Sequence, residues 1–163
     1  MSPVQIAVSK DQILAIVQEV FAAMLDAGEI CVFESGPSNT DDETLSAWVD
    51  MQMELPEGPL VARALVRTQQ ETAHEIVRSL LMMGSDEEIS YADLTDAFGE
   101  IANVVGGNVK SLVEVPARLS LPSVSNDAAH GPNGLFLQDL DVNWRGQHLN
   151  VSLWILPNSG EWS

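Results

Sequence analysis

The sequence predicts an α+β domain in which helices pack on a mainly antiparallel sheet built from hairpins. Two observations favour this class. Three segments repeat apolar residues every three to four positions, as amphipathic helices do. The segments between and after them alternate apolar and polar residues and are joined by short turns, as hairpin strands are. Because 163 residues is the length of one ordinary domain, we expect residues 1–163 to fold as a single unit.

Each of the first two expected helices opens with a capping signal. A capping box that starts at Ser9 precedes an apolar stripe and predicts a helix over residues 10–27. A second box, formed by Thr68 and Glu71, opens another apolar run that ends at Gly84. Glycine is the usual residue just beyond a helix end, so Gly84 is the expected stop.

The third expected helix is the longest. Ser90 can cap it after an acidic turn, and its periodicity continues to about Val113. The residues expected to face the core are Leu94, Ala97, Phe98, Ile101, Val105 and Leu112.

Residues 45–55 alternate apolar and polar side chains, which predicts a strand with one buried face, whereas residues 60–67 alternate less cleanly. A turn over residues 56–59 joins the first two as a hairpin, and a turn over residues 145–147 joins the last two. The expected strands cover residues 45–55, 60–67, 117–124, 135–144 and 149–155. The remaining segments at 34–43 and 125–134 have the composition of loops.

The charge of the chain excludes two classes of partner. Lys and Arg number 7 against 24 Asp and Glu, a formal net charge of −17. Without a basic surface the chain has nothing to bind nucleic acid or an anionic membrane. The chain starts without a signal-peptide pattern, contains no long uncharged run and has Cys31 as its one cysteine, so we expect a cytoplasmic protein.

Common catalytic motifs are also absent from the sequence. His74 and Glu75 begin like a zinc-protease helix, but Arg78 stands where the second histidine ligand is required. The sequence contains no nucleophile elbow, phosphate-binding glycine loop or dinucleotide fingerprint. We therefore expect no metal or cofactor of the chain's own.

The third helix carries an unusual polar side. Its members recur at spacings of 3 and 4, and they are Asp93, Asp96, Glu100, Asn103, Gly107 and Lys110. Gly99, Gly106 and Gly107 lie inside the helix, and each disfavours it by about 1 kcal/mol relative to alanine. Either an element of this protein packs closely there, or a partner approaches Glu100 and Asn103 from outside. The pattern alone leaves both explanations open.

Residues 96–110 of this helix resemble the signature helix of the CheC/CheX/FliY chemotaxis phosphatases. The shared features are a Glu-x-x-Asn pair, here Glu100 and Asn103, and a following Gly-Asn-x-x-Lys-like pattern. Members with two sites carry a second such pair in the first helix, whereas here Glu19 is followed by Val20, Phe21 and Ala22. A single pair points to the CheX branch, and the resemblance implies a CheC-like fold.

The resemblance also implies a reaction, the hydrolysis of the aspartyl phosphate on a CheY-like response-regulator receiver domain. Asn103 would hold the attacking water in line, and Glu100 would accept a lysine ammonium of the receiver. The required magnesium would belong to the receiver. The remaining residues that the resemblance implies for contact with the partner are Asp96, Gly99, Gly107 and Lys110.

Other functions remain open at this stage. A non-catalytic receiver-binding or flagellar-switch-like module would have the same architecture, and Asn103 is the feature that distinguishes the enzyme from switch-type relatives. An acidic chaperone or adaptor would explain the charge, although it would not explain the glycines. The sequence also leaves open which response regulator is served, whether the pathway is chemotaxis, and whether the domain forms a homodimer.

Overall fold

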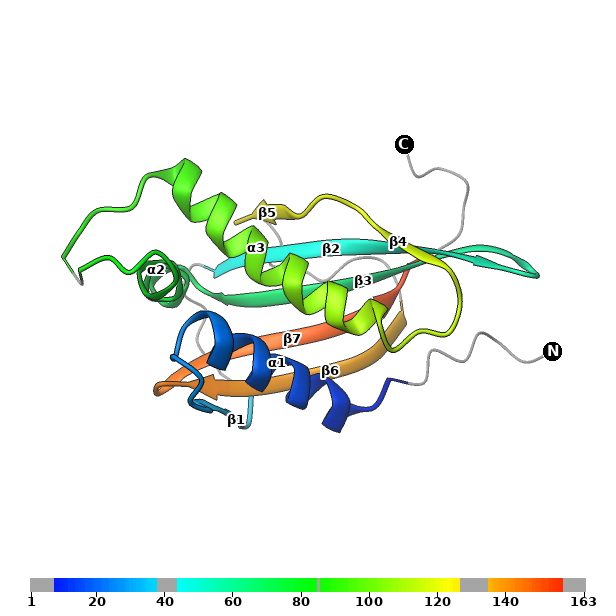
Figure 1. Cartoon of the computed structure of the whole chain (residues 1–163), viewed down its shortest axis with the longest axis horizontal. Coiled ribbons are helices and arrows are strands. Elements are labelled where there is room, and N and C mark those ends of the chain that lie inside the picture. Colours follow the sequence, from blue (N-terminus) through cyan, green and yellow to red (C-terminus); the bar gives the residue numbers. More distant parts are fainter. Residues whose placement is uncertain (1–7, 38–43, 85, 127–134, 157–163) are drawn as a thin grey trace.

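The computed structural model describes residues 8–37, 44–84, 86–126 and 135–156 (Figure 1). In these ranges all three helices lie on one face of the sheet (Figure 1). The helices are α1 (Lys10–Met24), α2 (Gln70–Leu80) and α3 (Tyr91–Lys110). None of them is long and apolar enough to cross a membrane.

The sheet of the described residues has seven strands, and every neighbouring pair is antiparallel. The strands are β1 (Val32–Glu34), β2 (Thr44–Leu55), β3 (Gly58–Gln69), β4 (Ala117–Leu119), β5 (Ser123–Ser125), β6 (Leu135–Trp144) and β7 (Gln147–Ile155). Their order is β1-β6-β7-β3-β2-β4, and β5 also pairs with β2. The predicted α+β class with helices on a mainly antiparallel sheet is confirmed.

Both predicted hairpins form. The β2–β3 ladder runs without interruption from Thr44 opposite Gln69 to Leu55 opposite Gly58. The β6–β7 turn consists of Arg145 and Gly146, whose φ angles are 50° and 84°. Positive φ at both central residues is the type I′ geometry, which matches the twist of the flanking strands.

The expected start of the second helix is wrong. Thr68 lies in β3, and its hydroxyl donates to the backbone oxygen of His148 at 2.7 Å. The residue that precedes α2 is Gln69, whose side chain forms no capping bond. Thr68 belongs to the sheet because it pairs with Leu149 in the β3–β7 ladder, where its side chain is buried.

The core lies between the helices and the sheet, and α3 is at its centre. Phe98, Ile101 and Val105 on α3 are at most 1% exposed and face the sheet, as predicted. Leu112 was expected in this stripe but is exposed, because α3 ends at Lys110. Val109 is buried at that end of the helix.

A buried carboxylate joins the helical layer to the sheet. Asp26 follows α1, and its side chain is 2% exposed. It accepts hydrogen bonds from the Trp144 indole at 3.0 Å and from Nε of Arg145 at 3.0 Å. Arg145 also donates to the Ser79 hydroxyl on α2 and lies over the Trp144 ring. These contacts connect the end of α1, the β6–β7 turn and α2.

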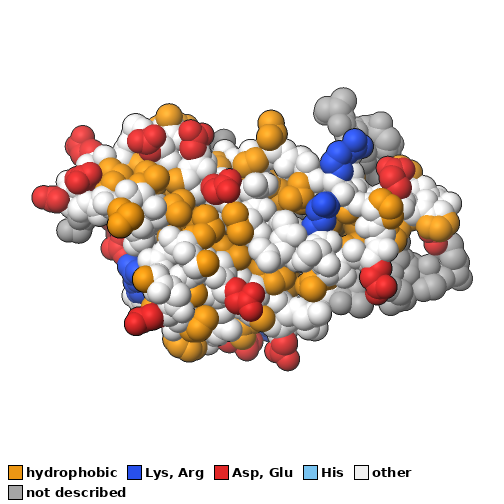
Figure 2. All heavy atoms as spheres, in the orientation of Figure 1, with side chains coloured by type: hydrophobic (Ala, Val, Ile, Leu, Met, Phe, Trp, Pro, Cys, Tyr) orange, Lys and Arg blue, Asp and Glu red, His pale blue; other side chains and the backbone are white. Residues whose placement is uncertain are grey.

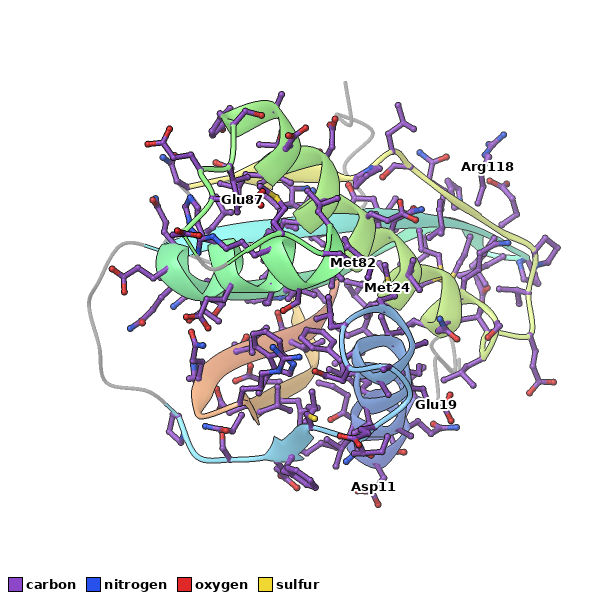
Figure 3. The ribbon with its side chains drawn as sticks, turned by 60° about the vertical axis from the view of Figure 1, so that its left-hand side comes forward. Asp11, Glu19, Met24, Met82, Glu87 and Arg118 are labelled. Atoms are coloured by element: carbon purple, nitrogen blue, oxygen red, sulfur yellow. The ribbon has the colours of Figure 1, made fainter. Side chains whose placement is uncertain are left out.

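Removing the cation of this cluster should destabilise the fold. Arg145→Ala leaves the Asp26 carboxylate buried without its charged partner, and we expect a loss of about 3 kcal/mol in the free energy of unfolding, measured in urea. Arg118→Ala is the matched control, because Arg118 points away from β4 (Figure 3) and forms no ion pair with a described residue. The control should stay within about 0.5 kcal/mol of the wild type. Equal losses in both variants would contradict a specific role for the buried pair.

Candidate functional site

Helix α3 carries the candidate site, and its start is fixed by a side chain. The Ser90 hydroxyl accepts a hydrogen bond from the backbone N–H of Asp93 at 3.1 Å, which confirms the predicted N-cap. The helix then continues for 20 residues. Its buried side packs on β2 and β3, and its flanks contact α1, α2, β4 and β5.

The structure places five of the six predicted site residues on one side of this helix. Asp96 and Glu100 are exposed, whereas Asn103, Gly107 and Lys110 are half-buried. Their spacings of 3 and 4 align them along about four turns of α3. The predicted polar side therefore exists as a surface of the molecule, with Glu100 and Asn103 one turn apart at its middle.

Gly99 does not belong to that surface. It is buried, and a Cβ built on it would lie 3.4 Å from both Pro122 Cβ and Val124 Cγ2. The close approach at this glycine is made by the segment that leads into β5. The structure thus gives Gly99 an internal packing role in place of the predicted contact with a partner.

Gly106 and Gly107 have opposite surroundings. A Cβ on Gly106 would lie 2.2 Å from Cγ2 of Val49 on β2, a distance that no side chain tolerates. A Cβ on Gly107 would meet only Leu119, at an ordinary 3.9 Å. Internal packing therefore explains Gly106, while the space beside Gly107 is largely open.

The side chains of Glu100 and Asn103 carry the polar groups at the middle of this surface. Neither forms a hydrogen bond or ion pair with any residue that the structure describes. Asn108, on the same helix, differs: its amide donates to the backbone oxygen of Val104 at 2.8 Å. A free carboxylate can accept a cation, and a free amide can both donate and accept hydrogen bonds. The pair therefore places a carboxylate that can accept a cation and a neutral amide that can form hydrogen bonds one turn apart.

The surroundings of this pair are acidic and apolar. Asp93 and Asp96 precede Glu100 on the same side of α3, and both are exposed. Acidic and hydrophobic side chains intermingle over the helix-covered face, with few basic ones (Figure 2). A partner that docks here should therefore present cationic and apolar groups.

Other reactive side chains lie elsewhere. Cys31 is half-buried, and the pKa of its thiol is raised by burial first and then by the carboxylates of Asp26 and Glu29. His74 contacts the Gln70 backbone oxygen at 2.6 Å. In the described ranges no group of three or more His, Cys, Asp and Glu residues could hold a metal ion. His130 lies outside those ranges.

The first helix carries no second pair of this kind. Glu19 points into solvent (Figure 3), but the two residues that follow it, Val20 and Phe21, are buried. Ala22, at the position of an asparagine in a Glu-x-x-Asn pair, is also buried. The single pair on α3 is therefore the candidate site of the described chain.

The family model described as "Chemotaxis phosphatase CheX" matches residues 52–132, close to half of the chain. This span includes the whole of α3 with Glu100 and Asn103. Over these residues the chain is similar to the CheX chemotaxis phosphatase family. No curated protein matches the sequence significantly.

Solved structures of CheX and CheC-like proteins share the fold. A chain of the CheX-CheY-BeF3-Mg+2 complex from Borrelia burgdorferi matches with a TM-score of 0.67 at 15% identity, covering 92% of this chain and 99% of that one. The chemotaxis protein CheX from Desulfovibrio desulfuricans matches with a TM-score of 0.66 at 18% identity, covering 93% and 99%. A CheC-like superfamily protein from Shewanella matches at 0.61 and 17%, covering 90% and 96%. These likenesses confirm the predicted CheC-like fold.

The sequence analysis did not predict the break in the segment that lies beside α3. The expected strand over residues 117–124 is in fact two short strands, β4 and β5, separated by residues 120–122. Leu119 and Pro122, at the two ends of this interruption, contact the glycines of α3. Pro122 was the available signal, because proline interrupts a strand ladder.

The two neighbouring glycines of α3 should respond oppositely to alanine. Gly106→Ala should lower the free energy of unfolding by about 1 to 3 kcal/mol, the usual range for overpacking. Gly107→Ala should leave the domain at least as stable, with a gain of up to about 1 kcal/mol from helix propensity.

A third variant identifies the cause. Val49→Ala removes the methyl that a Cβ on Gly106 would strike, so it should recover part of the loss when combined with Gly106→Ala. If the double variant loses the sum of the free energies of unfolding that the two single variants lose in urea, then the clash with Val49 on β2 does not explain why position 106 is a glycine.

Proposed function

We propose that this chain is a CheX family member that hydrolyses the aspartyl phosphate of a CheY-like response-regulator receiver, and that residues 1–163 do so as a single cytoplasmic domain. The observation that supports this is the pair Glu100 and Asn103 on the accessible side of α3, which bonds to none of the described residues and lies in the segment that matches the CheX family model. The alternative, a receiver-binding module without activity, would need the same docking surface but no orienting amide.

Asn103 is proposed to position the attacking water. Phosphoryl transfer to water passes through a loose, in-line transition state, so the catalyst gains most from orienting the nucleophile. The amide oxygen accepts a hydrogen bond from that water, and its N–H can donate to the water or to a phosphoryl oxygen. A half-buried amide suits this role because the surrounding helix limits its rotamers.

Glu100 is proposed to fix the docking register. Its exposed carboxylate lies one turn before Asn103 and would accept the ammonium of a lysine in the receiver's active site. The magnesium of the reaction is proposed to belong to the receiver. The Borrelia burgdorferi complex contains CheX, CheY, BeF3 and Mg+2.

The flanks of the pair are proposed to complete the contact. Gly107 leaves open space one turn beyond Asn103, where a partner's backbone can approach. Asp96 and Lys110 place opposite charges at the two ends of the same side. Such charges at an interface rim steer association and orientation more than they add affinity.

The proposed activity is tested by incubating the protein with a panel of phosphorylated receivers and magnesium. Faster loss of phosphate from at least one receiver, relative to its own decay, supports the enzyme. Tight binding without acceleration would support the non-catalytic module instead.

Asn103→Ala should reduce the accelerated dephosphorylation by roughly a hundredfold or more, because the water is no longer oriented. Receiver binding and thermal stability should change little, since the substitution lies on an accessible helix side. Asn108→Ala is the matched control, because the amide of Asn108 is already bound to its own helix. Undiminished hydrolysis by Asn103→Ala would sink the mechanism.

Glu100→Gln should weaken receiver binding by about 2 to 5 kcal/mol if the lysine pair is desolvated in the complex. Binding is measured by titrating a receiver that carries beryllofluoride and magnesium, at low and at high salt. Glu19→Gln on α1 makes the same chemical change at another exposed glutamate and should bind as the wild type does. If both variants bind equally well, Glu100 is a solvated surface residue.

A further inference from the structure

The interruption between β4 and β5 is a bulge of one extra residue. Met51 pairs with Leu119 and Trp48 pairs with Ser123, so two residues of β2 separate these pairs. On the other side three residues, 120–122, separate them. A bulge of this kind bends the strand and redirects a side chain, and such bulges are frequent beside active sites.

The side chain at the middle of the bulge is exposed on a fixed backbone. Leu121 is 87% exposed, although nearly all the large apolar residues of the core are below 10%. Before it, the Ser120 N–H donates to the Asp50 backbone oxygen at 2.8 Å, and the Ser120 hydroxyl accepts from the Asp50 N–H at 2.9 Å. After it, Pro122 packs against Gly99. Leu121 is therefore presented to solvent by a segment anchored on both sides.

The bulge lies beside the Glu-x-x-Asn pair. The segment that contains it runs along α3 (Figure 1), with Leu119 near Gly106 and Pro122 near Gly99. The stretch of α3 between these two contacts includes residues 100–103. Leu121 lies between these two contact residues, in the segment that runs beside the stretch of α3 carrying the pair.

We propose that Leu121 is an apolar anchor that seats the receiver beside the site and determines which receivers bind well. The inference rests on the proposed function and assigns it a further specificity-determining residue. The anchor requires an apolar patch next to the phosphorylated aspartate of the receiver. A receiver that has a polar residue there leaves the leucine unburied and binds weakly.

The charge of the surface favours a receiver over a second copy of this chain as the occupant. A symmetric pair formed through this edge would bring two acidic surfaces together, each with Asp93, Asp96 and Glu100 exposed. Like charges across an interface oppose association. A receiver instead supplies a lysine and a magnesium ion to the same surface.

The contact should act on binding and not on the chemical step. Leu121 offers no group to the phosphoryl transfer, so its burial stabilises the docked substrate and the transition state equally. Its loss should raise Kd and KM while kcat is unchanged. Because the backbone is held in place before docking, little ordering entropy opposes the contact.

The test uses the full chain with Leu121→Ser, with Leu121→Met, and with Phe33→Ser as the matched control. Phe33 is also exposed, at 58%, but lies on β1 at the opposite edge of the sheet. The receiver is the one that the wild type dephosphorylates fastest. Its beryllofluoride-magnesium form gives Kd, and its phosphorylated form gives KM and kcat. Leu121→Ser should raise Kd and KM about tenfold, which is the scale of burying a leucine side chain. Leu121→Met and Phe33→Ser should match the wild type.

Several results would overturn the inference while leaving the proposed function intact. One is a Leu121→Ser variant whose Kd and KM equal those of the wild type. Another is a fall in kcat at constant Kd, which would mean that the bulge acts through the geometry of the site. A third is a wild-type dimer in light scattering that Leu121→Ser dissociates, because the occupant would then be a second copy. A wild type that neither binds nor dephosphorylates any receiver would sink the proposed function and the inference together.

Discussion

The close contact between α3 and β2 is the constraint on which the rest of the structure depends. A Cβ on Gly106 would lie 2.2 Å from Cγ2 of Val49, so any larger residue at position 106 would force either the helix or Val49 to move. At the observed depth of the helix, Phe98, Ile101 and Val105 are fully packed against the sheet. A helix lifted by one methyl group would leave voids beneath these residues, and close packing is what a core of this kind gains its stability from. The position of the polar side of α3 therefore follows from a packing requirement on its opposite side.

The glycines of α3 divide between two neighbours of the helix. Gly106 allows close contact with Val49 of the sheet, and Gly99 allows close contact with Pro122. Both glycines are buried. Together they hold the helix between β2 and the segment that leads into β5. Glu100 and Asn103 lie on the side that neither contact covers, and their polar groups bond to none of the residues that the structure describes. A rigid helix that presents a few free groups is a suitable base for a site whose work is positioning, because the geometry is set before the partner arrives.

Local patterns in the sequence predicted the features that depend on local physics. The cap at Ser90, the β2–β3 turn and the shared side of Glu100 and Asn103 follow from spacings of a few residues, and the structure contains all three. The errors arose where distant segments meet. Thr68 was expected to cap a helix, but its hydroxyl binds His148, which is 80 residues away in sequence. The surroundings of Gly99 and the bulge at Leu121 likewise depend on which strand lies beside α3. The periodicity of a single segment does not indicate which distant strand packs against it.

The electrostatics of this surface give a reason for an amide at position 103. The exposed side of α3 already carries the carboxylates of Asp93, Asp96 and Glu100. A phosphorylated aspartate is itself strongly anionic, so a further carboxylate close to it would oppose the approach of the two proteins. In the proposed mechanism Glu100 is offset by the lysine that it binds, whereas a second carboxylate at the water would have no such partner. An amide orients the water through the same hydrogen-bonding atoms without adding charge. The proposed mechanism thus separates two tasks along one turn of helix: the charged residue selects the cationic partner, and the neutral residue directs the water.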